Sequence, residues 1–253
     1  ILKMPELAHD SSQRCLIYAH RGANTEAMEN TRRAFDKALH YAIDGIETDV
    51  QLTRDDIPVL WHDRFLDKIG LNNKHIDDFD HYQLQNMINP GSCGEDIMTL
   101  QDFLTRFRQR CRLLIEVKNR DWEPVSRHAL KMQKTLDLIG QNSDQRIIVS
   151  SFNLASLVYA HQLQPEFPLI YNIEPSQTSL EIRQLLKTHE FLHGFCLPIE
   201  SLQQEVVELL RESTKFIGVY TCNSDVEINT ALQFGVDILI SDLPQKALSM
   251  RDP

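Results

Sequence analysis

Short apolar runs alternate with amphipathic helical patterns along nearly the whole chain. The runs suit strands that are buried on both faces. The expected strands cover residues 16–19, 45–52, 113–117, 147–150, 168–171, 194–197, 216–220 and 237–241. Helical patterns lie between them, for example over residues 30–42, 99–108, 124–138, 154–163, 180–186, 202–210 and 225–234. Eight such repeats in about 250 residues predict an α/β fold that closes into a (β/α)8 TIM barrel.

An open doubly wound sheet is the alternative with the same alternation. No G-x-G-x-x-G pattern follows the first expected strand, which counts against a dinucleotide-binding version of that fold. The chain has 253 residues and a hydrophobic content of 42%, which is enough for one large core. We therefore expect a single barrel domain over residues 1–253, in which residues 250–253 form a loose tail.

One interval breaks the rhythm of strands and helices, at residues 54–98. It holds a strand-like segment at residues 58–62 and then a polar stretch, rich in Asp, Asn and His, at residues 68–93. Connections this long usually carry a function or some structure of their own. In a barrel this one leaves the C-terminal end of a strand, on the face where active sites lie. We expect a small inserted cap there.

Charge and cysteine content narrow the classes of function. The net charge of −10 disfavours binding to nucleic acids or anionic membranes. The five cysteines are odd in number and lack C-x-x-C spacing, which argues against a disulfide framework or a zinc ribbon. Residues 1–14 show no signal-peptide pattern, and no apolar run approaches the ~20 residues of a membrane span. We therefore expect a cytoplasmic protein without stable membrane association.

Carboxylates occur near the ends of two expected strands. Glu47 and Asp49 are two positions apart and so point to the same face, and Glu116 lies in the strand at 113–117. At a barrel mouth these three side chains would meet, and they could not all stay ionised without a cation. Ligands that are all oxygen favour Mg²⁺ or Ca²⁺ over zinc. The alternative is that they are solvated or ion-paired charges at strand ends.

Two histidines end strand-like apolar runs. His20 follows residues 16–19, His62 follows residues 58–61, and each has a charged neighbour, Arg21 or Asp63. Histidine titrates near neutral pH, so such a pair could act as acid and base on a phosphate ester. The alternative is two unrelated histidines among the ten in the chain.

Other residues of these segments could complete a site. Arg21 and Lys118 are candidates to contact a phosphate, although most such side chains are solvated surface charges. Trp61 and Phe152 lie beside strand ends and could line a pocket or pack in the core. A glycosidase would need two acids that face each other across a sugar. Glu47 and Asp49 share one strand face, which suits a metal better.

Taken in order, these segments resemble the glycerophosphodiester phosphodiesterase family. The resemblance covers nearly the whole chain and rests on His20-Arg21-Gly22, Glu29-Asn30-Thr31, Glu47-Thr48-Asp49-Val50, Pro58-Val59, His62-Asp63, Ile115-Glu116-Val117-Lys118 and Tyr220-Thr221-Cys222-Asn223. It implies a barrel with a small insertion after the second strand. It also implies roles for seven residues: the metal ligands Glu47, Asp49 and Glu116, the acid–base pair His20 and His62, and the phosphate contacts Arg21 and Lys118.

The resemblance implies hydrolysis of a glycerophosphodiester to sn-glycerol 3-phosphate and an alcohol, with one divalent ion, Mg²⁺ or Ca²⁺, and with Mn²⁺ as a further candidate. Two residues depart from the family pattern. Met28 stands where the family usually has proline, and Tyr220 where it usually has tryptophan. Tyr220 would lie on a substrate wall, so it bears on the head-group preference rather than on the reaction.

Several alternatives stay open at this stage. A glycerol hydroxyl could attack first and give a cyclic phosphate, or water could attack directly, and either histidine could be the base. A phospholipase C- or D-like enzyme on the same barrel would need an exposed apolar rim, against which the polar insertion argues. A barrel that only binds phosphate esters would have no need of two strand-end histidines. The oligomeric state is not predicted.

Overall fold

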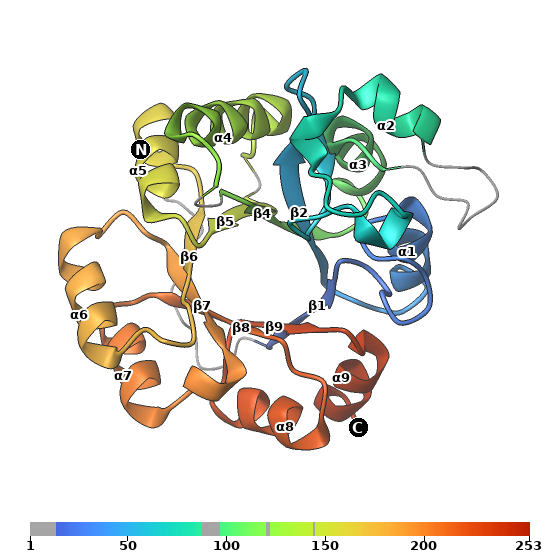
Figure 1. Ribbon diagram of the computed structural model, residues 1–253. Helices are drawn as coiled ribbons and strands as arrows, with labels where there is room; N and C mark the ends of the chain where they lie inside the picture. Colours follow the sequence, from blue (N-terminus) through green and yellow to red (C-terminus); the bar gives the residue numbers. More distant parts are fainter. Residues whose placement is uncertain (1–13, 88–96, 120–121, 144) are drawn as a thin grey trace.

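Eight parallel strands close into a barrel in the computed structural model, which describes residues 14–87, 97–119, 122–143 and 145–253 (Figure 1). Strand β1 pairs in parallel with both β2 and β9, which closes the sheet and excludes the open doubly wound alternative. The (β/α)8 prediction is confirmed. The barrel strands are β1 (Leu16–His20), β2 (Gly45–Leu52), β4 (Arg112–Val117), β5 (Ile147–Ser151), β6 (Leu169–Asn172), β7 (Gly194–Pro198), β8 (Phe216–Tyr220) and β9 (Ile238–Ser241).

Helices surround the barrel and begin at capping residues that the sequence supplies. Thr31, Thr99 and Asn153 each accept a backbone N–H at a helix start. Thr178 and Ser224 form capping boxes with the glutamate three positions later. The helices are α1 (Arg32–Ala38), α3 (Leu100–Phe107), α4 (Val125–Ile139), α5 (Leu154–Leu163), α6 (Ser179–Thr188), α7 (Gln204–Glu212), α8 (Asp225–Gln233), α9 (Pro244–Arg251) and the short η3 (Ile199–Ser201).

Alternate residues of the strands pack on opposite faces of the sheet. One set packs against the helices, where the rings of Phe35 and Phe103 lie 4.7 Å apart between centroids. The other set fills the barrel and includes Tyr18, Leu114 and Ile240. Every residue of β2 is buried, so its polar residues are buried with the apolar ones. A strand that places carboxylates in the interior must supply them with partners, and these partners form the site described below.

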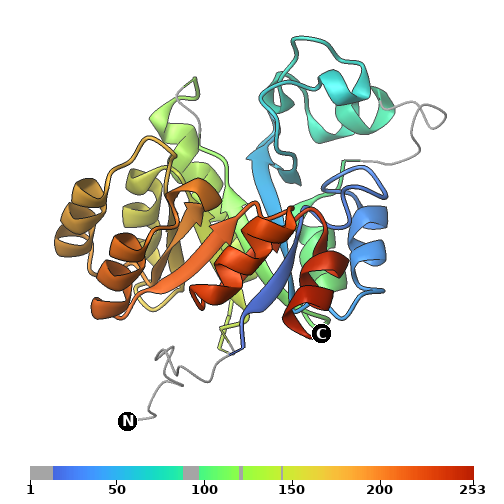
Figure 2. The same cartoon turned by 90° about the horizontal axis from the view of Figure 1, so that it is seen from below.

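The interval between β2 and α3 forms a small structured insertion. It contains β3 (Pro58–Leu60), which runs antiparallel to β2, then η1 (Asp67–Ile69), η2 (Ile76–Asp78) and α2 (His81–Met87). The insertion stands beyond one end of the barrel (Figure 2). It has its own apolar cluster, made of Val59, Trp61, Leu66, Ile76, Leu84 and Ile97. Part of the predicted cap, including Cys93, lies outside the described residues. The prediction that the insertion and the barrel form one domain is not tested and stays a prediction.

The C-terminal segment is more ordered than the sequence suggested. Helix α9 extends through Met250 to Arg251, so the expected loose tail is wrong for these two residues. The Arg251 side chain is 5% exposed, and its Nη1 lies 2.5 Å from Asp44 Oδ2 and 2.7 Å from the Cys15 carbonyl oxygen. A buried guanidinium needs such acceptors, and they fix the end of the chain against the start of β1.

Within the described part of the chain, none of the helices combines the length and the apolar character that crossing a bilayer requires. The described cysteines, Cys15, Cys111, Cys196 and Cys222, are buried free thiols.

Candidate active site

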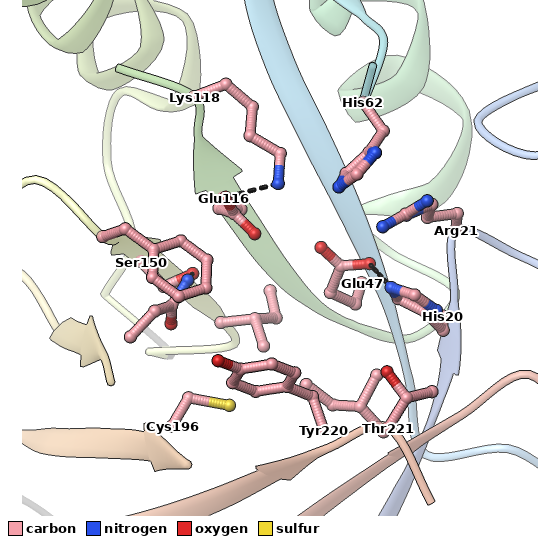
Figure 3. Close-up of a pocket in the computed structure, with 14 residues that line it drawn as sticks. His20, Arg21, Glu47, His62, Glu116, Lys118, Ser150, Cys196, Tyr220 and Thr221 are labelled. Carbon is pink, nitrogen blue, oxygen red and sulfur yellow. Dashed lines mark hydrogen bonds and ion pairs between the residues drawn. The ribbon is translucent and has the colours of Figure 1, made fainter. Parts of the chain in front are cut away.

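A pocket of about 250 Å³ opens at the end of the barrel where the parallel strands finish (Figure 3). Two of the predicted aromatic residues, Phe152 and Tyr220, form one wall with their rings edge to face at 6.0 Å between centroids. The opposite side is polar and carries residues that the sequence singled out: His20, Arg21, Glu47, His62, Glu116 and Lys118. Residues from four separate segments therefore meet at one pocket.

Three carboxylates lie close together at this polar side of the pocket, those of Glu47, Asp49 and Glu116. The register of β2 and β4 sets Asp49 directly opposite Glu116, and Glu47 lies two residues earlier on the same face of β2. One oxygen from each of these side chains lies within 4.8 Å of the others, and all three residues are buried. The group of Glu47, Asp49 and Glu116 is called the acidic cluster below. The strand register therefore explains how residues far apart in sequence come together.

Two cations hold Asp49 in the charged form. Lys118 Nζ lies 2.9 Å from Asp49 Oδ1 and 2.5 Å from Glu116 Oε1, and Arg21 Nε lies 3.1 Å from Asp49 Oδ2. Burial alone would raise the pKa of Asp49, but the charges of Lys118 and Arg21 outweigh it and hold that pKa well below its ordinary value. The two cations therefore favour the charged form of Asp49.

Glu47 has the opposite environment. Burial, followed by the neighbouring charge of Asp49, raises the pKa of Glu47 well above its ordinary value. Its Oε2 atom is buried, accepts no hydrogen bond among the described residues, and lies 3.9 Å from His20 Nε2. An unsatisfied buried carboxylate oxygen beside two other carboxylates fits a divalent cation with a preference for oxygen ligands. The residues present thus suit the metal that the sequence predicted.

The loop after β1 sets the position of Arg21. Its backbone has φ of 57°, in the left-handed region, and its N–H donates to the Glu47 carbonyl oxygen at 2.9 Å. Gly22 follows with φ of 84°, and a Cβ atom there would lie 2.7 Å from the Ala34 backbone. Only glycine fits this close approach of loop and helix. The strained turn directs the Arg21 side chain toward Asp49 rather than into solvent.

Asn30 orients the acidic cluster, and the sequence reasoning did not single it out. Its Nδ2 donates to Asp49 Oδ2 at 2.9 Å, while its Oδ1 accepts from Thr48 Oγ1 at 2.7 Å. Asn30 is buried and has φ of 58°, so the backbone and the amide are both held in place. Its place between Glu29 and Thr31 in the sequence could have drawn attention to Asn30, but nothing in the spacing of these residues identified Asp49 as its partner.

His20 is held through one ring nitrogen. Its Nδ1 lies 2.6 Å from Asp242 Oδ1, and Asp242 also accepts from the side-chain amides of Asn24 and Asn223. Burial would raise the pKa of Asp242, but its bond to His20 and the two amides lower it below the ordinary value. An ionised carboxylate only accepts hydrogen bonds, so His20 carries its proton on Nδ1 and presents Nε2 toward Glu47.

His62 lies on the same polar side of the pocket and is held in a similar way. Its Nδ1 lies 2.8 Å from Asp63 Oδ1, and burial, joined by the charges of Lys118 and Arg21, lowers the pKa of His62 below its ordinary value. Lys68, from the insertion, lies 2.8 Å from Asp63 Oδ2 and 2.9 Å from Glu29 Oε1. The insertion is therefore connected to the partner of this histidine.

A buried ion pair supports the backbone of Lys118. Lys131, in α4, is fully buried and donates to the Lys118 carbonyl oxygen and to both carboxylate oxygens of Glu123, at 2.8 and 2.7 Å. Burial outweighs the charge of Glu123 and lowers the pKa of Lys131 to about 8. A lysine in a helical pattern is usually solvated, so sequence reasoning had no signal for this contact.

Trp61 does not line the pocket. Its indole is 4% exposed, packs in the apolar cluster of the insertion, and donates to the Phe65 carbonyl oxygen at 3.2 Å. Trp61 and His62 are neighbours in an extended segment, so their side chains point to opposite sides. The direction of His62 toward the pocket therefore sends Trp61 into the insertion core. Of the two places that the sequence allowed for Trp61, the structure shows core packing and not the pocket lining.

Comparison with known proteins agrees with this geometry. The model of the glycerophosphoryl diester phosphodiesterase family matches residues 20–246. The chain belongs to this family. It is 29% identical to the glycerophosphodiester phosphodiesterase of Bacillus subtilis, over 92% of this chain and 85% of that protein. Membership of this family of phosphodiester-hydrolysing enzymes argues against a barrel that only binds its ligand.

Solved structures of family members share the barrel. A phosphodiesterase from Oleispira antarctica, solved with the product sn-glycerol 3-phosphate, is 25% identical with a TM-score of 0.81 and covers 94% of this chain and 97% of its own. The enzyme from Thermotoga maritima has 21% identity and a TM-score of 0.78, over 96% of this chain and 100% of its own. At this identity, the similarity to the Thermotoga maritima enzyme shows only that the two proteins share a fold.

Proposed function

We propose that this family member hydrolyses glycerophosphodiesters to sn-glycerol 3-phosphate and an alcohol, with the help of one divalent metal ion. The observation that carries the proposal is the meeting of two histidines, the acidic cluster and two cations at one pocket. The product seen in the Oleispira antarctica structure supports the substrate class. Glu47, Asp49 and Glu116 would hold Mg²⁺ or Ca²⁺, or alternatively Mn²⁺, which would polarise the phosphate ester when bound.

The two histidines are proposed as the acid–base pair. Each has a carboxylate on Nδ1, Asp242 for His20 and Asp63 for His62, which leaves Nε2 as the atom that exchanges protons with the substrate. One Nε2 takes the proton of the attacking group, a glycerol hydroxyl or water, and the other donates a proton to the leaving alcohol. Arg21 is proposed to contact the phosphate oxygens, since its guanidinium lines the pocket and matches an anionic oxygen pair.

Lys118 is proposed as the second phosphate contact. Its Nζ lies between Asp49 and Glu116, so it balances their charge and also lines the pocket that the phosphate would enter. Phe152 and Tyr220 would form the wall beside the substrate, and Lys118 Nζ lies 5.9 Å from the centre of the Phe152 ring. Tyr220 Oη donates to the Ile173 carbonyl oxygen at 2.6 Å, which fixes that wall.

The test is release of glycerol 3-phosphate from glycerophosphocholine and glycerophosphoethanolamine. Protein treated with a chelator should be inactive, and Mg²⁺, Ca²⁺ or Mn²⁺ should restore turnover. His20→Ala and His62→Ala should each lose at least about 10²-fold in kcat with unchanged circular dichroism. Absence of product with any metal, from folded protein, would refute the proposal. Near wild-type kcat in either variant would refute the acid–base roles.

Two experiments address the alternatives. Phosphorus NMR of the reaction would show a transient cyclic glycerophosphate if a glycerol hydroxyl attacks first, and only substrate and product if water attacks directly. Activity confined to micellar lysophospholipids, with none on soluble diesters, would favour the phospholipase-like reaction instead.

A further inference from the structure

The polar lining of the pocket continues past the acidic cluster onto two more strands. In the register of β4 and β5, Ser150 lies directly opposite Glu116. Asn172, at the end of β6, lies beside Ser150, with its Nδ2 at 3.4 Å from Ser150 Oγ. On the next strand the residue opposite Asn172 is Cys196, a buried thiol that also lines the pocket. The polar band therefore runs from Glu116 through Ser150 and ends at Asn172.

Asn172 is incompletely bonded although it is only 5% exposed. Its Oδ1 is shielded from solvent and has no hydrogen-bond partner among the described residues. The contact of its Nδ2 with Ser150 is at the long limit for a hydrogen bond. Because the terminal torsion of an asparagine is broad, the amide can turn either its oxygen or its nitrogen toward the pocket. A buried amide in this state indicates that a ligand group completes its bonding.

We infer that the Asn172 amide, oriented by Ser150, binds the terminal hydroxyl of the glycerol part of the substrate. This inference rests on the proposed function. With the phosphate between the two histidines and the neighbouring hydroxyl at the acidic cluster, the terminal hydroxyl would be one carbon farther away. We place it along the polar band that leads from Glu116 through Ser150 to Asn172. A hydroxyl group suits Asn172 because it can donate to the oxygen or accept from the nitrogen.

The consequence is a choice of substrate class. A glycerophosphodiester without acyl chains has the terminal hydroxyl free. A lysophospholipid acylated at that position has no hydrogen to donate and adds bulk beside Asn172 and Cys196, both of which are buried. A buried polar group left unpaired by the wrong substrate is an effective source of discrimination. The structure thus selects deacylated diesters through Asn172.

The test compares glycerophosphocholine with an analogue in which the terminal CH₂OH group is replaced by CH₃. The wild-type protein, supplied with metal, should prefer glycerophosphocholine by about 10- to 100-fold in kcat/KM. Asn172→Leu removes the amide at similar volume and should reduce this preference to within about threefold, mainly by slowing the reaction of glycerophosphocholine. Asn229→Leu makes the same substitution at an exposed position of α8, away from the pocket, and should keep the wild-type preference.

A second measurement does not depend on turnover or on the stability of the Leu variant. Calorimetry on the wild-type protein should show sn-glycerol 3-phosphate binding about 10-fold or more tighter than propane-1,2-diol phosphate, its analogue without the terminal hydroxyl. Equal binding, a wild-type preference near one, or an unchanged preference in Asn172→Leu would overturn the inference. Turnover of glycerophosphocholine without discrimination refutes only the role of Asn172, whereas binding with discrimination but no turnover refutes only the proposed function.

Discussion

Replacement of Asp242 by asparagine should test how the barrel prepares His20 for proton transfer. The Asp242 carboxylate accepts from His20 Nδ1 at 2.6 Å and from Asn223 Nδ2 at 2.6 Å, with Asn24 as a third donor. An asparagine has one acceptor oxygen and a donating NH₂ group, so it cannot satisfy three donors. We expect the His20 ring to lose its fixed tautomer, and Nε2 to carry the proton in part of the molecules.

The magnitude follows from the contact that is lost. A hydrogen bond to a charged group contributes about 1.5–3 kcal/mol, which corresponds to about 10- to 150-fold in rate if it acts fully in the transition state. The side chains of His20 and Asp242 are 17% and 28% exposed, so solvent screens the pair only in part. We therefore expect kcat of Asp242→Asn to fall by about 10²-fold, with KM changed by less than about threefold, because Asp242 does not line the substrate pocket.

The assay combines turnover of glycerophosphocholine with nitrogen NMR of labelled histidine, which reports the tautomer of His20 directly. A purely structural role of Asp242 would lower the melting temperature without changing that tautomer. Asp225→Asn is the control, because Asp225 is 72% exposed and pairs with Lys246. Wild-type kcat in Asp242→Asn, or a slow variant whose His20 still carries its proton on Nδ1, would refute the reasoning.

Two further perturbations test the contacts behind the site. Lys68→Met should lower kcat by about fivefold, because Lys68 holds Asp63 and Glu29. The free energy of unfolding should change by less than about 1 kcal/mol, because a half-exposed lysine contributes little to folding. Lys74→Met is the control in the insertion, and equal kcat values for the two variants would contradict this role of Lys68. Lys131 has a pKa of about 8 in the folded protein and 10.5 ordinarily, so between these values the unfolded chain binds more protons and the free energy of unfolding should rise with pH. The free energy of unfolding, measured with urea, should rise for the wild-type protein by up to about 3 kcal/mol more than for the Glu123→Gln/Lys131→Met variant between pH 8 and 10.5. If the unfolding free energies of the two proteins depend on pH in the same way, this titration of Lys131 is excluded.

The strand ends were the part of the site that the sequence could predict. Parallel strands in a barrel all finish at one face, so polar residues that end apolar runs must meet there. This reasoning found His20, Glu47, Asp49 and Glu116, which the structure brings together. Asp242 follows β9 in the same way. A lone carboxylate after a strand could not be recognised, however, because its partner His20 is distant in sequence.

The sequence predicted where the insertion lies in the chain, but not how its side chains pack. Its length and polarity showed where the chain leaves the barrel, whereas the directions of its side chains depend on packing. Trp61 illustrates the difference: its place beside a strand end allowed either the pocket or the core, and alternation along an extended segment puts the indole in the core. A residue next to a site residue in a strand is thus poorer evidence for the pocket than one two positions away.

The orientation of the reactive groups depends on residues whose hydrogen-bond partners no pattern identified. His20 and His62 each turn Nε2 away from the carboxylate that binds Nδ1, Asp242 or Asp63. Asn30 fixes Asp49 within the acidic cluster in a similar way. These partners come from three separate segments, and their hydrogen bonds exist only in the folded chain. Sequence spacing decides which residues reach the mouth of the barrel, whereas tertiary hydrogen bonds decide which atom each one presents. A family member could therefore keep every residue that contacts substrate and still lose activity through any of these three partners.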